Sequence, residues 1–269
     1  MNQTFGMADA TANLETRRLT ASEIFDAVTE IAGDELKRSP RALAFSGLAG
    51  GLTMGLTGLA VASVQAMLTG NPLQDLVSRL VYPIGFIAVI IGRAQLFTEN
   101  TLYPVVLVLD ERKHFRRLFR LWAIVFFCNV AGSFCFAVLA IRSGALHSEI
   151  AERLVHLGTV AASGSSGHLF WSGIIGGWLI ALVAWQVTAS HWTIGQIAMV
   201  WLLTFVVGAG KFAHCIAGSG EILSSVVAGV VPVSSYFHWL LFATLGNIVG
   251  GVFIVSLLNY GQVRGKLAG

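Results

Sequence analysis

The chain is short of charge. Of its 269 residues, 17 are Lys or Arg and 14 are Asp or Glu, so charged residues make up 12% of the sequence, whereas a soluble domain averages about 25%. Between residues 121 and 263 the charged side chains are only Arg142, Glu149, Glu152, Arg153, Lys211 and Glu221. Apolar residues reach 55% and the mean hydropathy is +0.74. A soluble fold cannot cover its surface with so few polar groups, and the sequence therefore predicts an all-α polytopic membrane protein.

Cysteine is also scarce. Cys128, Cys135 and Cys215 lie in apolar stretches without a metal-binding spacing, which excludes a disulfide framework and predicts no metal site and no cofactor. The net charge of +3 argues against a nucleic-acid partner. The first forty residues contain no apolar core, so we expect no signal peptide. The apolar runs are too long and too uniform for a transmembrane β-barrel.

Apolar runs of about 20 residues predict six transmembrane spans. The runs cover residues 43–68, 80–109, 119–141, 169–189, 195–218 and 237–259. Polar residues interrupt the second span at Arg93 and Glu99, and Lys211 and His214 interrupt the fifth. We therefore expect a cytoplasmic N-terminal segment (1–42), a six-helix pore domain (43–260) and a short C-terminal tail (261–269).

The basic residues predict the orientation. Twelve of them fall on one side of the predicted spans: Arg17, Arg18, Lys37, Arg38, Arg41, Arg112, Lys113, Arg116, Arg117, Arg120, Arg264 and Lys266. Three fall on the other side (Arg79, Arg142 and Arg153), and Arg93 and Lys211 remain at membrane depth. Since positive charge stays in the cytoplasm, both termini are predicted to be cytoplasmic in an inner (plasma) membrane.

An amphipathic helix is predicted ahead of the first span. Thr20 and Glu23 have the spacing of a capping box, and Ile24, Phe25 and Val28 fall with Ile31 on one helical face. We expect this helix to lie against the cytoplasmic surface.

The two halves of the chain resemble each other. Residues 46–51 (SGLAGG) are echoed by residues 172–177 (SGIIGG), and Asn129 with its following glycine is echoed by Asn247. Because each half would hold three spans, the halves must have opposite orientations. Inverted repeats with helices interrupted at corresponding places indicate a channel or transporter with its site near the midplane of the membrane.

Several segments together resemble the formate/nitrite transporter family over nearly the whole chain. They are residues 94–98 (AQLFT), 182–185 (LVAW), 212–217 (FAHCIA) and 246–251 (GNIVGG). The resemblance implies an aquaporin-like fold, a homopentamer with one pore in each protomer, and passage of small monovalent anions or their conjugate acids.

His214 is the first candidate for the pore. A neutral imidazole with a pKa near 6.5 can donate a hydrogen bond to an anion or hand it a proton, and the resemblance makes this residue the central pore histidine. The alternative is a packed, hydrogen-bonded core histidine. For Asn247, one reading is a partner that fixes the tautomer of His214, and the other is a hydrogen-bonding residue between closely packed helices.

The remaining candidates surround the two interruptions. The resemblance places Leu96, Phe97 and Thr98 on the pore side, with Thr98 near His214. Val207 and Phe212 are candidates for the opposing apolar wall of a constriction that a neutral acid crosses more cheaply than a bare anion. For each of these apolar residues, plain packing is the alternative.

The charges at membrane depth also allow alternatives. Arg93 and Glu99 are expected to pair with each other. Lys211 either draws anions toward His214 or pairs with Glu99 across the two breaks.

The sequence departs from the family pattern at two places. Residues 161–165 (AASGS) lack the lysine that most members carry ahead of the fourth span, and Gly177 stands where the family has an asparagine. Both changes remove polar character from the expected pore, which leaves the substrate open. Lys211 is a candidate to compensate for the missing lysine.

The sequence thus predicts a channel or transporter, not an enzyme, for small weak-acid anions, proton-linked through His214. A pore for a small neutral solute is the alternative within transport, although Asn71-Pro72 lies outside the spans. A membrane enzyme or a structural scaffold is the alternative from another class, and no nucleophile–base pair lies at membrane depth to favour it.

Overall fold

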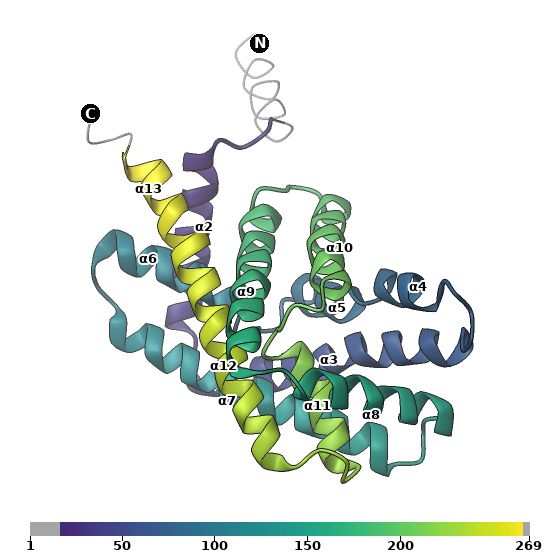
Figure 1. The fold of residues 1–269 in the computed structure, drawn as a ribbon. Coiled ribbons are helices and arrows are strands. Elements are labelled where there is room, and N and C mark those ends of the chain that lie inside the picture. The colour runs from purple at the N-terminus through teal and green to yellow at the C-terminus, as the bar shows by residue number, and fades with distance from the viewer. Residues whose placement is uncertain (1–16, 266–269) are drawn as a thin grey trace, which may run out of the picture.

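Every regular element is a helix in the computed structural model, which describes residues 17–265 (Figure 1). The predicted all-α class is confirmed for this part of the chain. Residues 1–16 and 266–269 lie outside it, and with them lie Lys266, the first part of the expected N-terminal segment and the end of the expected tail.

Five helical stretches among the described residues are long and apolar enough to cross a membrane. They are α3 (Pro40–Met67), α4 with α5 (Gln74–Ile91), α7 (Phe115–Arg142), α9 (Ser166–Thr188), and α12 (Val233–Val249) continued through the π-helical η2 (Gly250–Leu257) into α13 (Leu258–Arg264). These stretches fall on five of the six expected spans. The expected fifth span is occupied by α10 (Thr193–Ala209), an apolar helix of only 17 residues.

The two expected interruptions are real breaks in the helical path. After α4 (Gln74–Leu80) and α5 (Ile84–Ile91), the chain leaves the helix and resumes in the 3₁₀ turn η1 (Glu99–Thr101) and α6 (Tyr103–Glu111). After α10, it leaves the helix again and resumes in α11 (Ala217–Val227). Each break begins with a residue in the left-handed region, Arg93 with φ 56° and Lys211 with φ 53°. This conformation ends helices, although glycine usually adopts it.

Glycines let two pairs of helices approach to backbone contact. A Cβ atom on Gly51 of α3 would overlap the backbone of Asn129 on α7, and a Cβ atom on Gly177 of α9 would overlap the backbone of Asn247 on α12. In the membrane, where lipid is as apolar as a leucine side chain, such close packing is a main source of helix association. The SGxxGG segments therefore bring each asparagine next to a break.

An additional helix, α8 (Ser148–Ala162), lies between α7 and α9, where no span is expected. Leu154 and Gly158 are its buried residues. A Cβ atom on Gly158 would overlap the backbone of Glu221 on α11, so α8 packs directly on the helix that follows the second break. It covers the end of the molecule opposite α2 (Figure 1).

The predicted amphipathic helix is α2 (Ala21–Lys37), and its capping box between Thr20 and Glu23 is present. The N–H and hydroxyl groups of Thr20 donate to the Glu23 carboxylate and lower its pKa. The buried face includes Phe25 and Val28, whereas Ile31 is half-buried.

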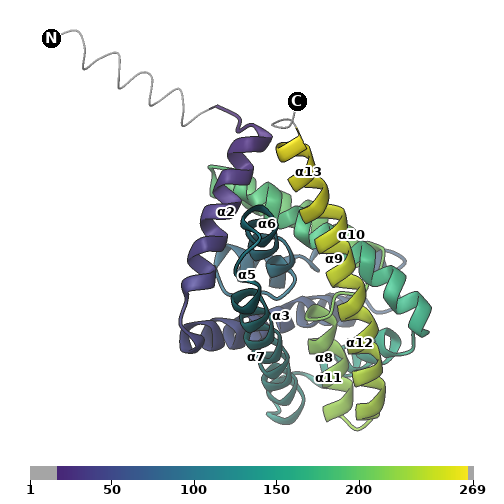
Figure 2. The ribbon, with the colours of Figure 1, turned by 90° about the vertical axis from the view of Figure 1, so that its left-hand side faces the viewer.

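This helix is held by the rest of the fold. It packs beside α6 and α13 (Figure 2). The Arg264 guanidinium donates to both carboxylate oxygens of Asp110, at 2.6 and 2.5 Å, and lies 5.0 Å from the ring centroid of Phe25. These contacts join the two ends of the described chain to α6.

Candidate functional site

Asn129 anchors the first break. Its Oδ1 accepts a hydrogen bond from the N–H of Phe97 at 2.9 Å. Its Nδ2 donates to the carbonyl oxygens of Gln95 at 2.9 Å and Gly47 at 2.7 Å. The Ser46 hydroxyl accepts from the N–H of Gln95 at 3.1 Å. Side chains of α3 and α7 thus supply the backbone partners that the interrupted helix no longer provides.

Asn247 anchors the second break through the same set of bonds. Its Oδ1 accepts from the N–H of Cys215 at 2.8 Å, and its Nδ2 donates to the carbonyl oxygens of Ala213 at 2.9 Å and Gly173 at 2.8 Å. The Ser172 hydroxyl accepts from the N–H of Ala213 at 2.9 Å. Position by position, Leu96 of the first break corresponds to His214 of the second, since each stands between the two residues that the asparagine binds.

The expected direct contact between Asn247 and His214 is absent among the hydrogen bonds of residues 17–265. Both N–H donors of the Asn247 amide and its oxygen bind backbone groups, and the two ring nitrogens of His214 bind Thr98 and Ala217 instead. Of the two readings of Asn247, the geometry supports the one in which it holds closely packed segments together. Asn247 therefore acts on His214 only by fixing the break that carries it.

His214 is 2% exposed and bonded at both ring nitrogens. Its Nε2 lies 2.8 Å from the hydroxyl oxygen of Thr98, and its Nδ1 accepts from the N–H of Ala217 at 3.0 Å. The neutral ring therefore carries its proton on Nε2 and donates it to Thr98. Phe86 packs edge-on against the ring, with centroids 5.0 Å apart. The structure brings Thr98 and His214 together from the two breaks, as expected.

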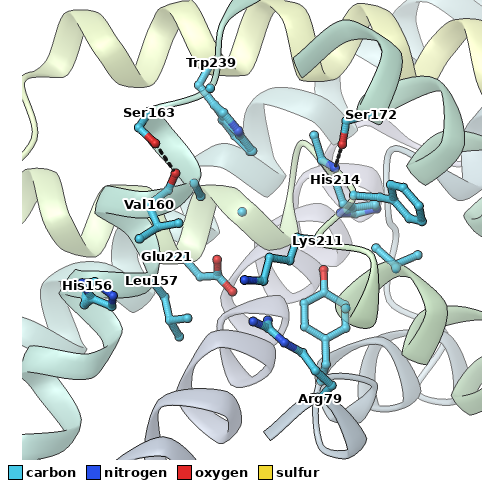
Figure 3. A pocket seen from close by; sticks show the side chains of 18 of the residues that line it. Arg79, His156, Leu157, Val160, Ser163, Ser172, Lys211, His214, Glu221 and Trp239 are labelled. Carbon is cyan, nitrogen blue, oxygen red and sulfur yellow. Dashed lines mark hydrogen bonds between the residues drawn. The ribbon is translucent and has the colours of Figure 1, made fainter. Parts of the chain in front are cut away.

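A cavity of about 450 Å³, here called the large cavity, leads to His214 from the end of the molecule that carries α8. Figure 3 shows His214 at its inner end, beside Ser172. Val207 and Phe212 also line the large cavity.

The small cavity, of about 60 Å³, lies at the other break. It is lined by Glu35 of α2, by Arg93, Leu96 and Glu99 of the first break, and by Tyr103 of α6. The two cavities thus reach the corresponding positions Leu96 and His214, and the contact between Thr98 and His214 joins the two breaks.

Phe97 does not line either cavity, contrary to the expectation of a pore-side residue. Its ring packs edge-on against Trp122 and Phe126 of α7, with centroid distances of 5.7 and 5.0 Å. Phe97 is 2% exposed and corresponds to Cys215 in the second break. The geometry therefore supports the alternative of plain packing for Phe97, whose ring lies against α7.

Neither expected ion pair of Glu99 occurs within the described residues. Arg93 lines the small cavity with Glu99, but their charged atoms do not come within 4.0 Å of each other. Lys211 lines the large cavity instead. Of the two alternatives for Lys211, the pairing with Glu99 across the breaks is therefore wrong, because the two residues line different cavities.

The packing of Gly177 explains why no asparagine stands at this position. Any side chain at position 177 would overlap the backbone of Asn247, so an asparagine cannot fit there with this helix spacing. Gly177 serves the approach of α9 to α12. The missing lysine is a different matter, since Ala161, Ser163 and Gly164 do line the large cavity, and the same cavity holds Lys211.

Four charged residues that sequence reasoning missed as pore candidates also line the large cavity: Asp75 and Arg79 of α4, Arg153 of α8 and Glu221 of α11. Arg79 was counted only as a topology signal, and Glu221 only as one of the rare charges. The rarity of charged residues in this region is the feature that could have drawn attention to them. Nothing in the sequence shows that α4 and α11 line the same cavity. Among residues 17–265, no group of three or more His, Cys, Asp or Glu side chains is placed to hold a metal ion.

Long apolar helices, two corresponding breaks and a cavity that leads to each break define the class of a membrane transporter or channel. The family model described as "Formate/nitrite transporter" matches residues 22–261. The chain is 33% identical over 251 residues to the Inner membrane protein YfdC of Escherichia coli (strain K12), which covers 92% of this chain and 80% of that protein. It is 31% identical over 235 residues to a Probable formate transporter of Methanothermobacter thermautotrophicus, with 81% and 83% covered.

Two solved structures share the fold. One is described as an "FNT family ion channel", with a TM-score of 0.79, 20% identity, and 88% of this chain and 98% of that chain covered. The other is described as a "Pentameric formate channel with formate bound", with a TM-score of 0.70, 19% identity, and 84% and 97% covered. The chain belongs to the formate/nitrite transporter family. This confirms the predicted transporter or channel class and the prediction that the chain is not an enzyme.

Proposed function

We propose that the chain forms a channel for small monovalent weak-acid anions or their conjugate acids, and that passage is linked to a proton at His214. The observation that carries the proposal is the contact between Thr98 and His214, with one cavity leading to each break. Relatives named as a probable formate transporter and a formate channel support formate or a similar anion as substrate.

The architecture that goes with this proposal is an aquaporin-like fold of six spans in two inverted three-helix repeats. The matched bonds of Asn129 and Asn247 support the repeat, since each anchors a break with the same atoms. The cytoplasmic N-terminal segment (1–42), the pore domain (43–260) and the C-terminal tail (261–269) keep their expected bounds. The large cavity then opens to the outside, and the small cavity opens toward α2 and the cytoplasm of an inner-membrane protein.

A homopentamer with one pore in each protomer is part of the proposal. The similar structure described as a pentameric formate channel supports this assembly. Large apolar side chains that are exposed on the single chain, such as Phe127, Trp171 and Phe253, would face neighbouring protomers or lipid.

Proton linkage follows from the chemistry of the layer around His214. A bare anion would lose its hydration between Leu96, Val207 and Phe212, whereas the neutral acid would not. His214 presents a proton on Nε2, and Thr98 accepts it at 2.8 Å. Because the Thr98 hydroxyl accepts from His214, its own hydrogen is free to donate to a substrate oxygen. In the proposed relay, Thr98 passes its hydroxyl proton to the anion and takes the Nε2 proton of His214, while Nδ1 exchanges its bond to Ala217 for a proton from water, so that the ring stays neutral. Asn247 holds the break in place.

The proposal is tested by transport into proteoliposomes that contain the purified full-length protein. Formate and nitrite uptake should exceed that of protein-free vesicles and should increase as the external pH falls, because each anion that passes His214 takes up a proton. Glycerol and urea serve as neutral probes. Uptake of these two solutes without any uptake of weak acids would overturn the anion proposal in favour of a neutral-solute pore.

We expect Lys211→Met to reduce formate uptake at low concentration by about threefold or more, since a fixed cation in a cavity concentrates anions. Methionine removes the ammonium group. Like lysine, it is unbranched at Cβ, so it should adopt the left-handed backbone of residue 211 as well as lysine does. The measurement is the initial uptake rate in proteoliposomes. Lys113→Met, which removes a cation from the exposed segment between α6 and α7, is the matched control and should leave uptake unchanged. Equal rates for the Lys211 variant and the wild type would contradict a role in attraction.

A further inference from the structure

Three charged side chains face one another inside the large cavity. They are Arg79 of α4, Lys211 of the second break and Glu221 of α11. Figure 3 shows the guanidinium group of Arg79, the ammonium group of Lys211 and the carboxylate of Glu221 turned toward a common space. Charged groups at membrane depth are costly unless they serve a pathway or a partner. The proton-linked layer at His214 does not account for Arg79 or Glu221.

No direct ion pair joins these three groups. Among the described residues, no nitrogen of Arg79 or Lys211 lies within 4.0 Å of a Glu221 carboxylate oxygen. The space between them is part of the cavity and is therefore open to a small ligand. Opposite charges that stop short of contact attract each other through the low-dielectric surroundings, but each remains able to bind a third group.

Glu221 is held in this place by packing. A Cβ atom on Gly58 of α3 would come within contact distance of its side chain, and a Cβ atom on Gly158 of α8 would overlap its backbone. These two glycines allow α3 and α8 to close on α11 at the level of Glu221. This packing places the carboxylate at the wall of the cavity.

We propose that Arg79, Lys211 and Glu221 form a capture site for a small monovalent carboxylate or oxyanion, in which Glu221 limits how tightly the anion is held. The inference rests on the proposed function and adds the residues that set affinity. Two cations without a counter-charge would bind an anion firmly and slow its departure toward His214. A channel needs binding strong enough for entry and weak enough for exit. The carboxylate competes with the anion for both cations and leaves the site with one net positive charge.

The test compares Glu221→Gln with the wild type in formate uptake at a fixed pH of about 7.5, where carboxylates are ionised. We expect the half-saturating formate concentration to fall about tenfold, which corresponds to about 1.4 kcal/mol, and the maximal rate to fall as well. Glu152→Gln, on the exposed face of α8 and outside the cavity, is the control and should leave both values unchanged.

A second measurement records binding without transport. Formate and nitrite should raise the melting temperature of the detergent-purified Glu221→Gln variant at lower concentrations than they do for the wild type. Arg79→Gln should have the opposite effect and increase the half-saturating concentration, so a Glu221 variant that does not fold still leaves a decisive result.

The outcomes separate this inference from the proposed function. If the wild type takes up formate but the Glu221 and Arg79 variants keep its half-saturating concentration, the capture site is wrong and the channel function stands. If the wild type neither transports nor binds formate or nitrite, the proposed function is overturned together with the capture site.

Discussion

Replacement of Asn247 by leucine is expected to lower the free energy of unfolding by about 3–5 kcal/mol, because each buried backbone group left without a partner costs about 1–3 kcal/mol. The substitution removes the bonds to the N–H of Cys215 and to the carbonyl oxygens of Ala213 and Gly173. No water reaches these groups from lipid to replace the amide. The measurement is unfolding of the purified protein in a mild detergent, followed by circular dichroism.

Two further variants serve as a control and as a test of the equivalent position in the first break. Asn259→Leu removes one hydrogen bond, to the carbonyl oxygen of Val255, from a partly buried asparagine on α13, and should cost less than Asn247→Leu. Asn129→Leu removes an equivalent set of bonds at the first break and should cost about as much. An Asn247 variant as stable as the Asn259 variant would contradict the anchoring role. An Asn129 variant that retains full stability would contradict the equivalence of the two breaks.

Much of the fold follows from the sequence because its causes are local. Long apolar runs require helices, since an unpaired backbone is too costly in lipid. The interruptions at Arg93 and Lys211 could be located because charge is rare in such runs. The paired SGxxGG segments indicated close helix contacts, which the structure places against Asn129 and Asn247. The start of α2 could also be predicted, because its capping box depends on two residues only three positions apart.

The parts that could not be predicted depend on contacts between distant segments. The direction in which Phe97 points is decided by Trp122 and Phe126 on α7, and no spacing within the break reveals it. Arg79 and Glu221 come from α4 and α11, far apart in the sequence, and only the tertiary fold brings them to one cavity. Lys211 and Glu99 cannot pair because they line different cavities, and the sequence does not show which cavity each residue faces.

Replacement of His214 by asparagine is expected to reduce formate uptake about 10–100-fold and to remove most of its dependence on pH, in line with the loss of a proton-transferring group. The asparagine Oδ1 takes the approximate place of Nδ1 and can still accept from the N–H of Ala217, so α11 keeps its start. The contact from Nε2 to Thr98 is lost, and so is the group that takes and releases a proton. The measurement is initial uptake in proteoliposomes at pH values of about 5.5 and 7.5, both above the pKa of an ordinary carboxyl group, so that the substrate is mainly the anion at each.

Two further variants, His214→Gln and Thr98→Val, separate the loss of the contact with Thr98 from the loss of proton transfer. The glutamine Nε2 can reach Thr98 in the manner of the imidazole Nε2, but it cannot exchange a proton, so a linked mechanism predicts slow uptake without pH dependence. Thr98→Val keeps the shape and removes the hydroxyl that accepts from His214. It should slow uptake and weaken its pH dependence, because the relay between His214 and the substrate is lost. If the Asn and Gln variants both transport formate at the wild-type rate with the wild-type pH profile, His214 is a packed core residue and the proton is carried elsewhere. Slow uptake that still rises at acid pH in both variants would instead leave His214 a role in binding and assign the pH dependence to the substrate itself.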